Sequence, residues 1–211
     1  MDFMRAVRFP FDDDDWVIKF VIGSLLVLIP FMAPGYQVRV ARNLIRGGKR
    51  PLPETDELGE VFVDGLMVAI AGFLYYLPLI LVLCIFAIPA AAVGDNDLGV
   101  LLLCMSWSCI LLVSLAYVVP ATALLWAGII RYADTGNFVE FLRFGSLWRD
   151  VTENMRSFGV LLVFMVVLAL LATLIAPVAL ITLVGIIVLG FYTQVVSGHL
   201  IGQAGREILG Q

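Results

Sequence analysis

Long apolar runs separated by short polar segments dominate the pattern along this chain. Four stretches contain no charged residue: residues 20–38, 65–94, 98–130 and 157–205. A helix needs about 20 mainly apolar residues to cross the hydrocarbon core of a bilayer. The first three stretches each accommodate one such helix, and the fourth accommodates two with a hinge near Pro177. The pattern therefore predicts about five transmembrane helices.

The predicted fold class is all-α, a polytopic membrane helical bundle of about five transmembrane helices plus two interfacial amphipathic helices. Residues 1–211 form a single integral membrane domain. Pro30 and Pro34 predict a bend at the far end of the first span, because proline removes a backbone hydrogen-bond donor. The expected spans are at about residues 16–36, 65–90, 98–130, 157–176 and 178–200.

Two longer polar connections, at about residues 37–64 and 131–156, each contain apolar residues at helical spacing. This spacing predicts an amphipathic helix lying in the membrane interface in each connection. In the first connection the apolar residues are Leu58, Val61, Phe62 and Leu66. In the second they are Phe141, Phe144, Trp148, Val151 and Met155.

The composition agrees with a bilayer environment, since 62% of the residues are hydrophobic and only 14% are charged. A soluble domain of this size has no interior large enough for so much apolar side chain. The cysteines Cys84, Cys104 and Cys109 all lie in apolar runs, where a disulfide framework or a zinc site would lack polar neighbours. We expect buried free thiols there.

Charge predicts the orientation in the cell membrane, because basic residues in short loops stay on the cytoplasmic side. With five spans, ten basic residues follow the first, third and fifth helices, and three, Arg5, Arg8 and Lys19, lie on the other face. The N-terminus is then outside and the C-terminus cytoplasmic. In the alternative, the first apolar segment enters the membrane and returns without crossing. Four spans remain, the N-terminus is cytoplasmic, and all 13 basic residues lie on the cytoplasmic side.

A basic cluster follows the first apolar segment and suits anionic lipid headgroups, although ordinary topology anchoring explains it equally well. Nucleic-acid binding is not expected, because the formal net charge is −4 and the basic residues are intermixed with apolar ones. The candidate headgroup contacts are Arg39, Arg42, Arg46, Lys49 and Arg50.

Two pairs of small residues allow close approach between helix backbones. They are Gly198 with Gly202 and Ala172 with Ala176. We expect them to pack the last two spans against each other, with a homodimer contact as the alternative.

Few ionisable residues lie within the apolar runs, where each would be costly and would mark function. Asp64 lies near a helix end, where pairing with a basic neighbour explains it better than an ion pathway. His199 is the single histidine, with no metal-ligating partner three or four residues away, so we expect a hydrogen-bonded interface histidine. Residues 12–15 are all aspartate and favour a solvated helix start over a calcium site. No catalytic, cofactor-binding or metal-binding residue is predicted.

Several segments resemble one family. They are residues 9–16 (Phe-Pro-Phe-Asp-Asp-Asp-Asp-Trp), 52–59 (Leu-Pro-Glu-Thr-Asp-Glu-Leu-Gly) and 61–66 (Val-Phe-Val-Asp-Gly-Leu). The chain resembles the uncharacterised prokaryotic multi-pass membrane proteins grouped as domain of unknown function four-thousand-and-thirteen. Thr55 stands where the family has an aromatic residue. The resemblance implies a membrane architecture and assigns no activity, cofactor or catalytic residue.

These features predict a non-enzymatic integral membrane component that organises lipid or a partner complex through the two amphipathic cytoplasmic segments. Its partners would be the lipid bilayer and a membrane protein or a second copy of the chain. The alternative is a small transporter or channel subunit with a site at proline-broken helices. The prolines concerned are Pro78, Pro89, Pro120 and Pro177.

Overall fold

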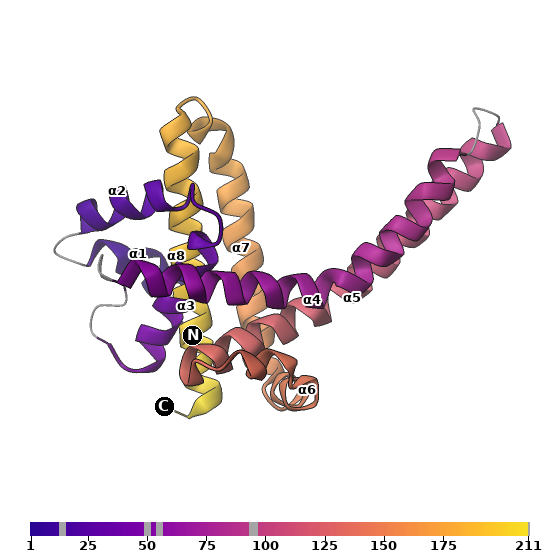
Figure 1. Cartoon of the computed structure of the whole chain (residues 1–211). Helices are drawn as coiled ribbons and strands as arrows, with labels where there is room; N and C mark the ends of the chain where they lie inside the picture. Colours follow the sequence, from indigo (N-terminus) through magenta and orange to yellow (C-terminus); the bar gives the residue numbers. More distant parts are fainter. Residues whose placement is uncertain (13–15, 49–51, 54–56, 93–96, 211) are drawn as a thin grey trace.

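The structure, a computed structural model, describes residues 1–12, 16–48, 52–53, 57–92 and 97–210. Every regular element in these ranges is a helix, which confirms the predicted fold class (Figure 1). The elements are α1 (Phe3–Arg8), η1 (Phe9–Phe11), α2 (Trp16–Leu26), α3 (Met32–Ile45), α4 (Leu58–Ala92), α5 (Asp97–Thr135), η3 (Phe138–Leu142), α6 (Phe144–Glu153), α7 (Met155–Ala179) and α8 (Leu183–Leu209).

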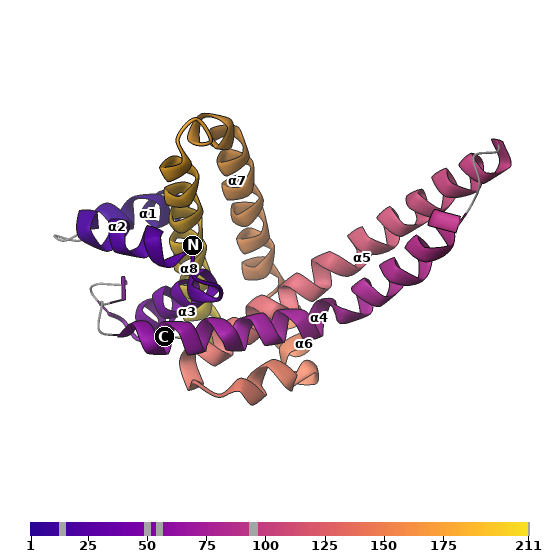
Figure 2. The ribbon, with the colours of Figure 1, turned by 45° about the horizontal axis from the view of Figure 1, so that its top comes forward.

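Two helical hairpins, α4 with α5 and α7 with α8, form the apolar framework. Figures 1 and 2 show α4 and α5 side by side along an arm that diverges from α7 and α8. In the described part of the chain, four helices are long and apolar enough to cross a membrane. They are Leu58–Ile85, Trp107–Thr135, Met155–Ala179 and Val184–Leu209. The protein is therefore a multi-pass membrane protein.

The first expected span is divided, which corrects the prediction of about five spans. Residues 16–36 do not form one helix, because α2 ends at Leu26 and α3 begins only at Met32. The 11 residues of α2 reach about 16 Å, half of a hydrocarbon core. Between α2 and α3 the chain turns, with Phe31 in the left-handed region at φ 72°. Pro30 disfavours helix in the residue before it, and Pro34 lies in the first turn of α3, where no backbone donor is required.

The expected interfacial helix around Leu58 is not a separate element. A single helix of 35 residues, α4, runs from Leu58 to Ala92 and includes it. The preceding polar connection is also largely helical, since α3 extends to Ile45. Hydrophobic spacing correctly predicted a helix that begins near Leu58. The expected boundary between this helix and the apolar span after Asp64 is absent, because α4 is continuous.

The second amphipathic segment is confirmed as a helix, α6, preceded by the short η3. Of the predicted stripe, Phe144 and Trp148 of α6 and Met155 at the start of α7 lie exposed, whereas Val151 is half-buried and packs against the core. Phe141 differs, because it lies in η3 and packs its ring against Gly128 of α5. Leu147 is likewise fully buried and fixes the inner face of α6.

Helix α3 lies between the two hairpins and contacts α4, α5 and α8. Its buried face includes Val38, Ala41 and Ile45, which share one hydrophobic core with Leu200 and Ala204 of α8. Burying these side chains between three helices gives the segment after the first apolar run a central place in the fold.

Gly198 and Gly202 pack α8 against α3, not against α7 as the sequence predicted. A Cβ on Gly198 would meet the backbone of Gln37, and one on Gly202 would lie 3.0 Å from Leu44. The expectation failed because it paired the two spans adjacent in sequence, whereas α3 also packs against α8 and occupies this face. Ala172 and Ala176 are half-buried on α7.

The cysteines are only partly as expected. Cys84 and Cys109 are free thiols, but their side chains are exposed on the surfaces of α4 and α5 and not buried within the fold. Both residues lie on the arm formed by α4 and α5, and their side chains face away from the protein. The side chain of Cys104 lies outside the described residues.

Candidate functional site: a buried charge cluster around Asp64

A buried carboxylate joins three helices at the inner end of the arm. Asp64 of α4 is 5% exposed. Its oxygens accept hydrogen bonds from Arg39 Nε at 2.8 Å and from Arg42 Nη1 and Nη2 at 2.8 and 3.1 Å. The hydroxyl of Tyr132 on α5 donates to it at 2.7 Å. Donors from α3 and α5 therefore surround a single acid on α4.

Close packing of α3 against α4 lets the arginines reach this acid. Gly35 of α3 and Gly65 of α4 both lie where a Cβ would overlap the backbone of the other segment. Arg39 and Arg42 are three residues apart, so they lie on one face of α3. Arg42 also donates from Nε to the carbonyl of Ala133 at 3.1 Å, which ties the same guanidinium to α5.

Acidic residues at the start of α4 extend the cluster toward its surface. Arg39 donates to Glu60, and Glu57 lies 3.8 Å from the same guanidinium. Burial disfavours the charged form of Arg39, but the Glu60 hydrogen bond and the carboxylates of Asp64, Glu60 and Glu57 outweigh it and raise the pKa of the guanidinium. Arg39 therefore stays charged at any physiological pH.

A hollow of about 420 Å³ opens beside the cluster. Arg39, Arg42, Asp64 and Tyr132 form its inner wall, and the exposed Arg46 lies at its rim. Arg46 donates to the carbonyl of Asp134 at 3.3 Å. The arginine side chains that line the hollow are thus already bound to acceptors of the same chain.

The cluster connects helices through hydrogen bonds and ion pairs. Both oxygens of Asp64 already accept hydrogen bonds from cationic or hydroxyl donors. With both oxygens occupied, this carboxylate has little capacity left to accept a further hydrogen bond or to bind an ion. Removing one partner from a buried ion pair is costly, so the arrangement holds α3, α4 and α5 in one geometry.

A second ion cluster fastens α6 to α5. Arg131 donates from Nε and Nη2 to the two carboxylate oxygens of Asp150 at 2.5 and 3.0 Å. Its Nη1 also lies 3.4 Å from Glu140, which accepts a hydrogen bond from Arg143 at 2.8 Å. Asp150 of α6 is therefore directed toward α5.

The predicted headgroup residues are divided by the structure. Arg39 and Arg42 are each 7% exposed, and carboxylates of the same chain bind them. Arg46 is exposed, and Lys49 and Arg50 lie outside the described residues. The expected pairing of Asp64 with a basic neighbour is confirmed. Sequence reasoning missed Tyr132, whose place beside Arg131 at the end of a span was the available signal.

His199 and the acidic run were the other candidates. His199 is 2% exposed, its Nδ1 lies 3.0 Å from Nε2 of Gln203, and its ring stacks on Phe9 at 4.2 Å, so the expected hydrogen bond is present. Three of the four aspartates, residues 13–15, lie outside the described residues. Among the residues that the structure describes, no three His, Cys, Asp or Glu side chains are grouped to hold a metal ion.

Comparison with known proteins assigns the chain to a family. No curated protein and no solved structure matches the chain. One family model, described as "Protein of unknown function (DUF4013)", matches residues 22–180. The match runs from α2 to the end of α7 and includes both ion clusters. It covers well over half of the sequence, so this multi-pass membrane protein belongs to the DUF4013 family.

Proposed function

We propose that this protein is a non-enzymatic membrane component that organises lipid or a partner complex at the cytoplasmic face, with α6 lying in the headgroup layer. The outer face of α6 carries the proposal. Phe144 and Trp148 are 51% and 52% exposed, whereas Leu147 between them is fully buried. An apolar face that the chain itself leaves uncovered needs another apolar environment.

Lipid is the environment that fits this face best. Helix α6 leads directly into the apolar α7, so it lies where a membrane span begins. Trp and Phe favour the interface, and the exposed Arg149 lies beside Trp148 to meet anionic headgroups. The Arg131–Asp150 pair fixes the roll of the helix so that its aromatic side faces outward.

The absence of catalysis is part of the proposal and is supported by how the polar groups are used. Asp64, Glu140 and Asp150 each accept hydrogen bonds from arginines of neighbouring segments. These acids hold helices together, which suits a component that displays a fixed surface.

Spin labelling tests the proposal in a reconstituted bilayer. With the native cysteines replaced by serine, a label at Trp148→Cys is expected to collide more with oxygen than with a water-soluble nickel reagent, because it lies among lipid. A label at the neighbouring Arg149→Cys is expected to show the reverse. Equal accessibility to the nickel reagent at both positions would contradict the proposal. Shielding of position 148 from both reagents would indicate a protein partner or a second copy there, and would contradict the placement of α6 in the headgroup layer.

We further propose that both ends of the described chain lie in the cytoplasm, with the segment from α2 to α3 entering and leaving the membrane on that side. The amino group of Met1 lies 2.6 Å from Glu207 of α8, so the two ends are adjacent (Figure 1). Four spans return the chain to its starting side. Ile18, Val21 and Leu25 of α2 are exposed, as an inserted segment requires. All 13 basic residues then satisfy the charge rule.

Cysteine accessibility in intact cells tests this orientation. In the cysteine-free background, Ile181→Cys at the tip of the α7–α8 hairpin, where Ile181 is 81% exposed, is expected to react with a membrane-impermeant maleimide from outside. Arg149→Cys is expected to react only after the membrane is opened. The opposite pattern would overturn the proposed orientation.

A further inference from the structure

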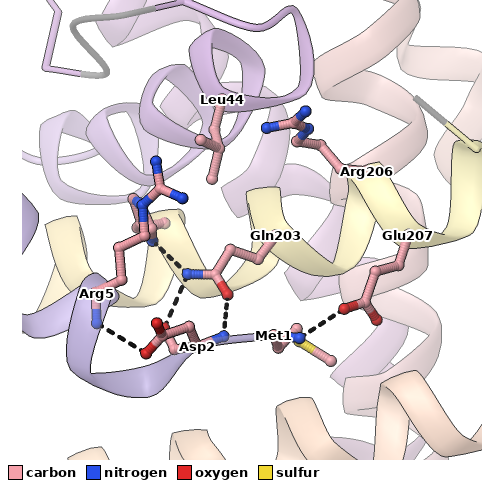
Figure 3. Close-up of a pocket in the computed structure, with 8 residues that line it drawn as sticks. Met1, Asp2, Arg5, Leu44, Gln203, Arg206 and Glu207 are labelled. Atoms are coloured by element: carbon pink, nitrogen blue, oxygen red, sulfur yellow. Dashed lines mark hydrogen bonds and ion pairs between the residues drawn. The ribbon is translucent and has the colours of Figure 1, made fainter.

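A second polar hollow lies at the end of α8, away from the Asp64 cluster (Figure 3). Its volume is about 440 Å³. Residues of α8 form one wall, the segment around α1 forms the opposite wall, and Leu44 of α3 adds an apolar side chain. The lining residues are Met1, Asp2, Arg5, Leu44, His199, Gln203, Arg206 and Glu207.

Most polar groups in this hollow are bound to one another. Gln203 accepts a hydrogen bond from the amide of Asp2 at 2.5 Å and donates to its carbonyl at 3.0 Å. The side chain of Asp2 accepts from the amide of Arg5 at 3.0 Å. Glu207 accepts from the amino group of Met1 at 2.6 Å and from Ser157 at 3.0 Å. Each of the two acids thus already accepts a hydrogen bond from a group of the same chain.

Two guanidinium groups remain. Within the part of the chain that the structure describes, the side chains of Arg5 and Arg206 have neither a hydrogen-bond acceptor nor a carboxylate partner. In Figure 3 both extend beside Leu44, Arg5 from α1 and Arg206 from α8. Together with the amino group of Met1, they exceed the charge of Asp2 and Glu207 by one positive charge.

We propose that this hollow binds a phosphate group, with Arg5 and Arg206 as its cationic ligands. Two guanidinium forks from different helices match the several oxygens of a phosphate better than the two of a carboxylate. The hollow lies at the end of α8, a helix long and apolar enough to cross a membrane, so we expect it at the headgroup layer. The phosphate belongs to a phospholipid headgroup or to a free phosphate in the cytoplasm. The site is separate from α6 and does not depend on the role proposed for that helix.

Binding to the full chain in an uncharged detergent tests the site. Native mass spectrometry with dihexanoyl phosphatidic acid and calorimetric titration with inorganic phosphate are the two arms. The double variant Arg5→Gln/Arg206→Gln is expected to weaken binding about tenfold or more, because it removes both charged donors. A double variant at two exposed arginines elsewhere, Arg8→Gln/Arg143→Gln, removes the same charge and is expected to bind within about twofold of the unmodified protein.

The two arms identify the source of the phosphate. Arginine-dependent binding of the lipid alone indicates a headgroup site, and arginine-dependent binding of inorganic phosphate that competes with the lipid indicates a soluble ligand. Equal weakening in both double variants would show nonspecific attraction and overturn the proposal. Undiminished binding in Arg5→Gln/Arg206→Gln, or no binding of either probe to the unmodified protein, would also overturn it. Since Arg5 and Arg206 are exposed, an unchanged thermal midpoint is expected for both variants.

Discussion

Replacement of Asp64 by Asn is expected to lower the free energy of unfolding by about 3 kcal/mol or more, because it leaves two buried guanidinium groups without their shared charge. The side chains of Arg39 and Arg42 are each 9% exposed, and that of Asp64 is 7% exposed. An amide keeps the shape of the side chain but supplies no charge to either arginine. Unfolding by a denaturing detergent in mixed micelles measures the loss.

Glu60→Gln is the matched control for this substitution. Glu60 contacts the same Arg39, but its side chain is 70% exposed. Water screens such a pair, so the loss is expected to stay below about 1 kcal/mol. Similar losses for the two variants would contradict the view that burial makes Asp64 the central residue of the cluster.

Gly65→Ala is expected to destabilise the protein by about 3 kcal/mol, toward the upper end of the range for overpacked sites. A Cβ on Gly65 would overlap the carbonyl oxygen of Phe31 and approach the backbone nitrogen of Gly35 to 2.9 Å. Backbone atoms at the start of α3 have no rotamer with which to move aside. Helices α3 and α4 would have to separate, which also weakens the Asp64 ion pairs. The same unfolding measurement detects the change.

Gly72→Ala on the same helix controls for the loss of glycine itself. A Cβ there would lie 4.0 Å from the side chain of Leu125, which is ordinary contact, and nothing lies within 4 Å at Gly59. Gly72→Ala and Gly59→Ala are each expected to leave the free energy of unfolding unchanged or slightly raised, since alanine favours helix. A loss at Gly72 as large as that at Gly65 would indicate that the effect does not arise at the contact between α3 and α4.

Asp64→Asn and Gly65→Ala both act on the packing of α3 against α4, through which the two hairpins are connected. Helix α3 packs against α8 at Gly198 and Gly202, and it is bound to α4 through Asp64. The Arg42 hydrogen bond to Ala133 adds α5. Because α3 connects both hairpins, loosening it is expected to change the angle at which the arm leaves α7 and α8. The position of α6, which is fastened to α5, would change with it.

Apolar periodicity and composition were sufficient to predict the membrane class, the four long helices and the amphipathic α6. These properties are local, since a run of about 20 apolar residues or an apolar stripe at helical spacing is visible in one segment alone. The pairing of Asp64 was predictable for the same kind of reason. A carboxylate at the edge of an apolar run requires a cation, and arginines were abundant nearby.

Tertiary structure alone decided the course of residues 16–45 and everything that depends on it. Pro30 and Pro34 predicted a bend, but the hydropathy pattern of residues 20–38 does not show that the helix is interrupted from Leu26 to Met32. Once α3 folds back, Arg39 and Arg42 reach an acid more than 20 residues away in the sequence, and Gly198 meets Gln37 across more than 150. The partner of a charge or of a glycine depends on which backbones approach each other. That approach is set by packing among helices distant in sequence, so a pattern within one segment carries no information about it.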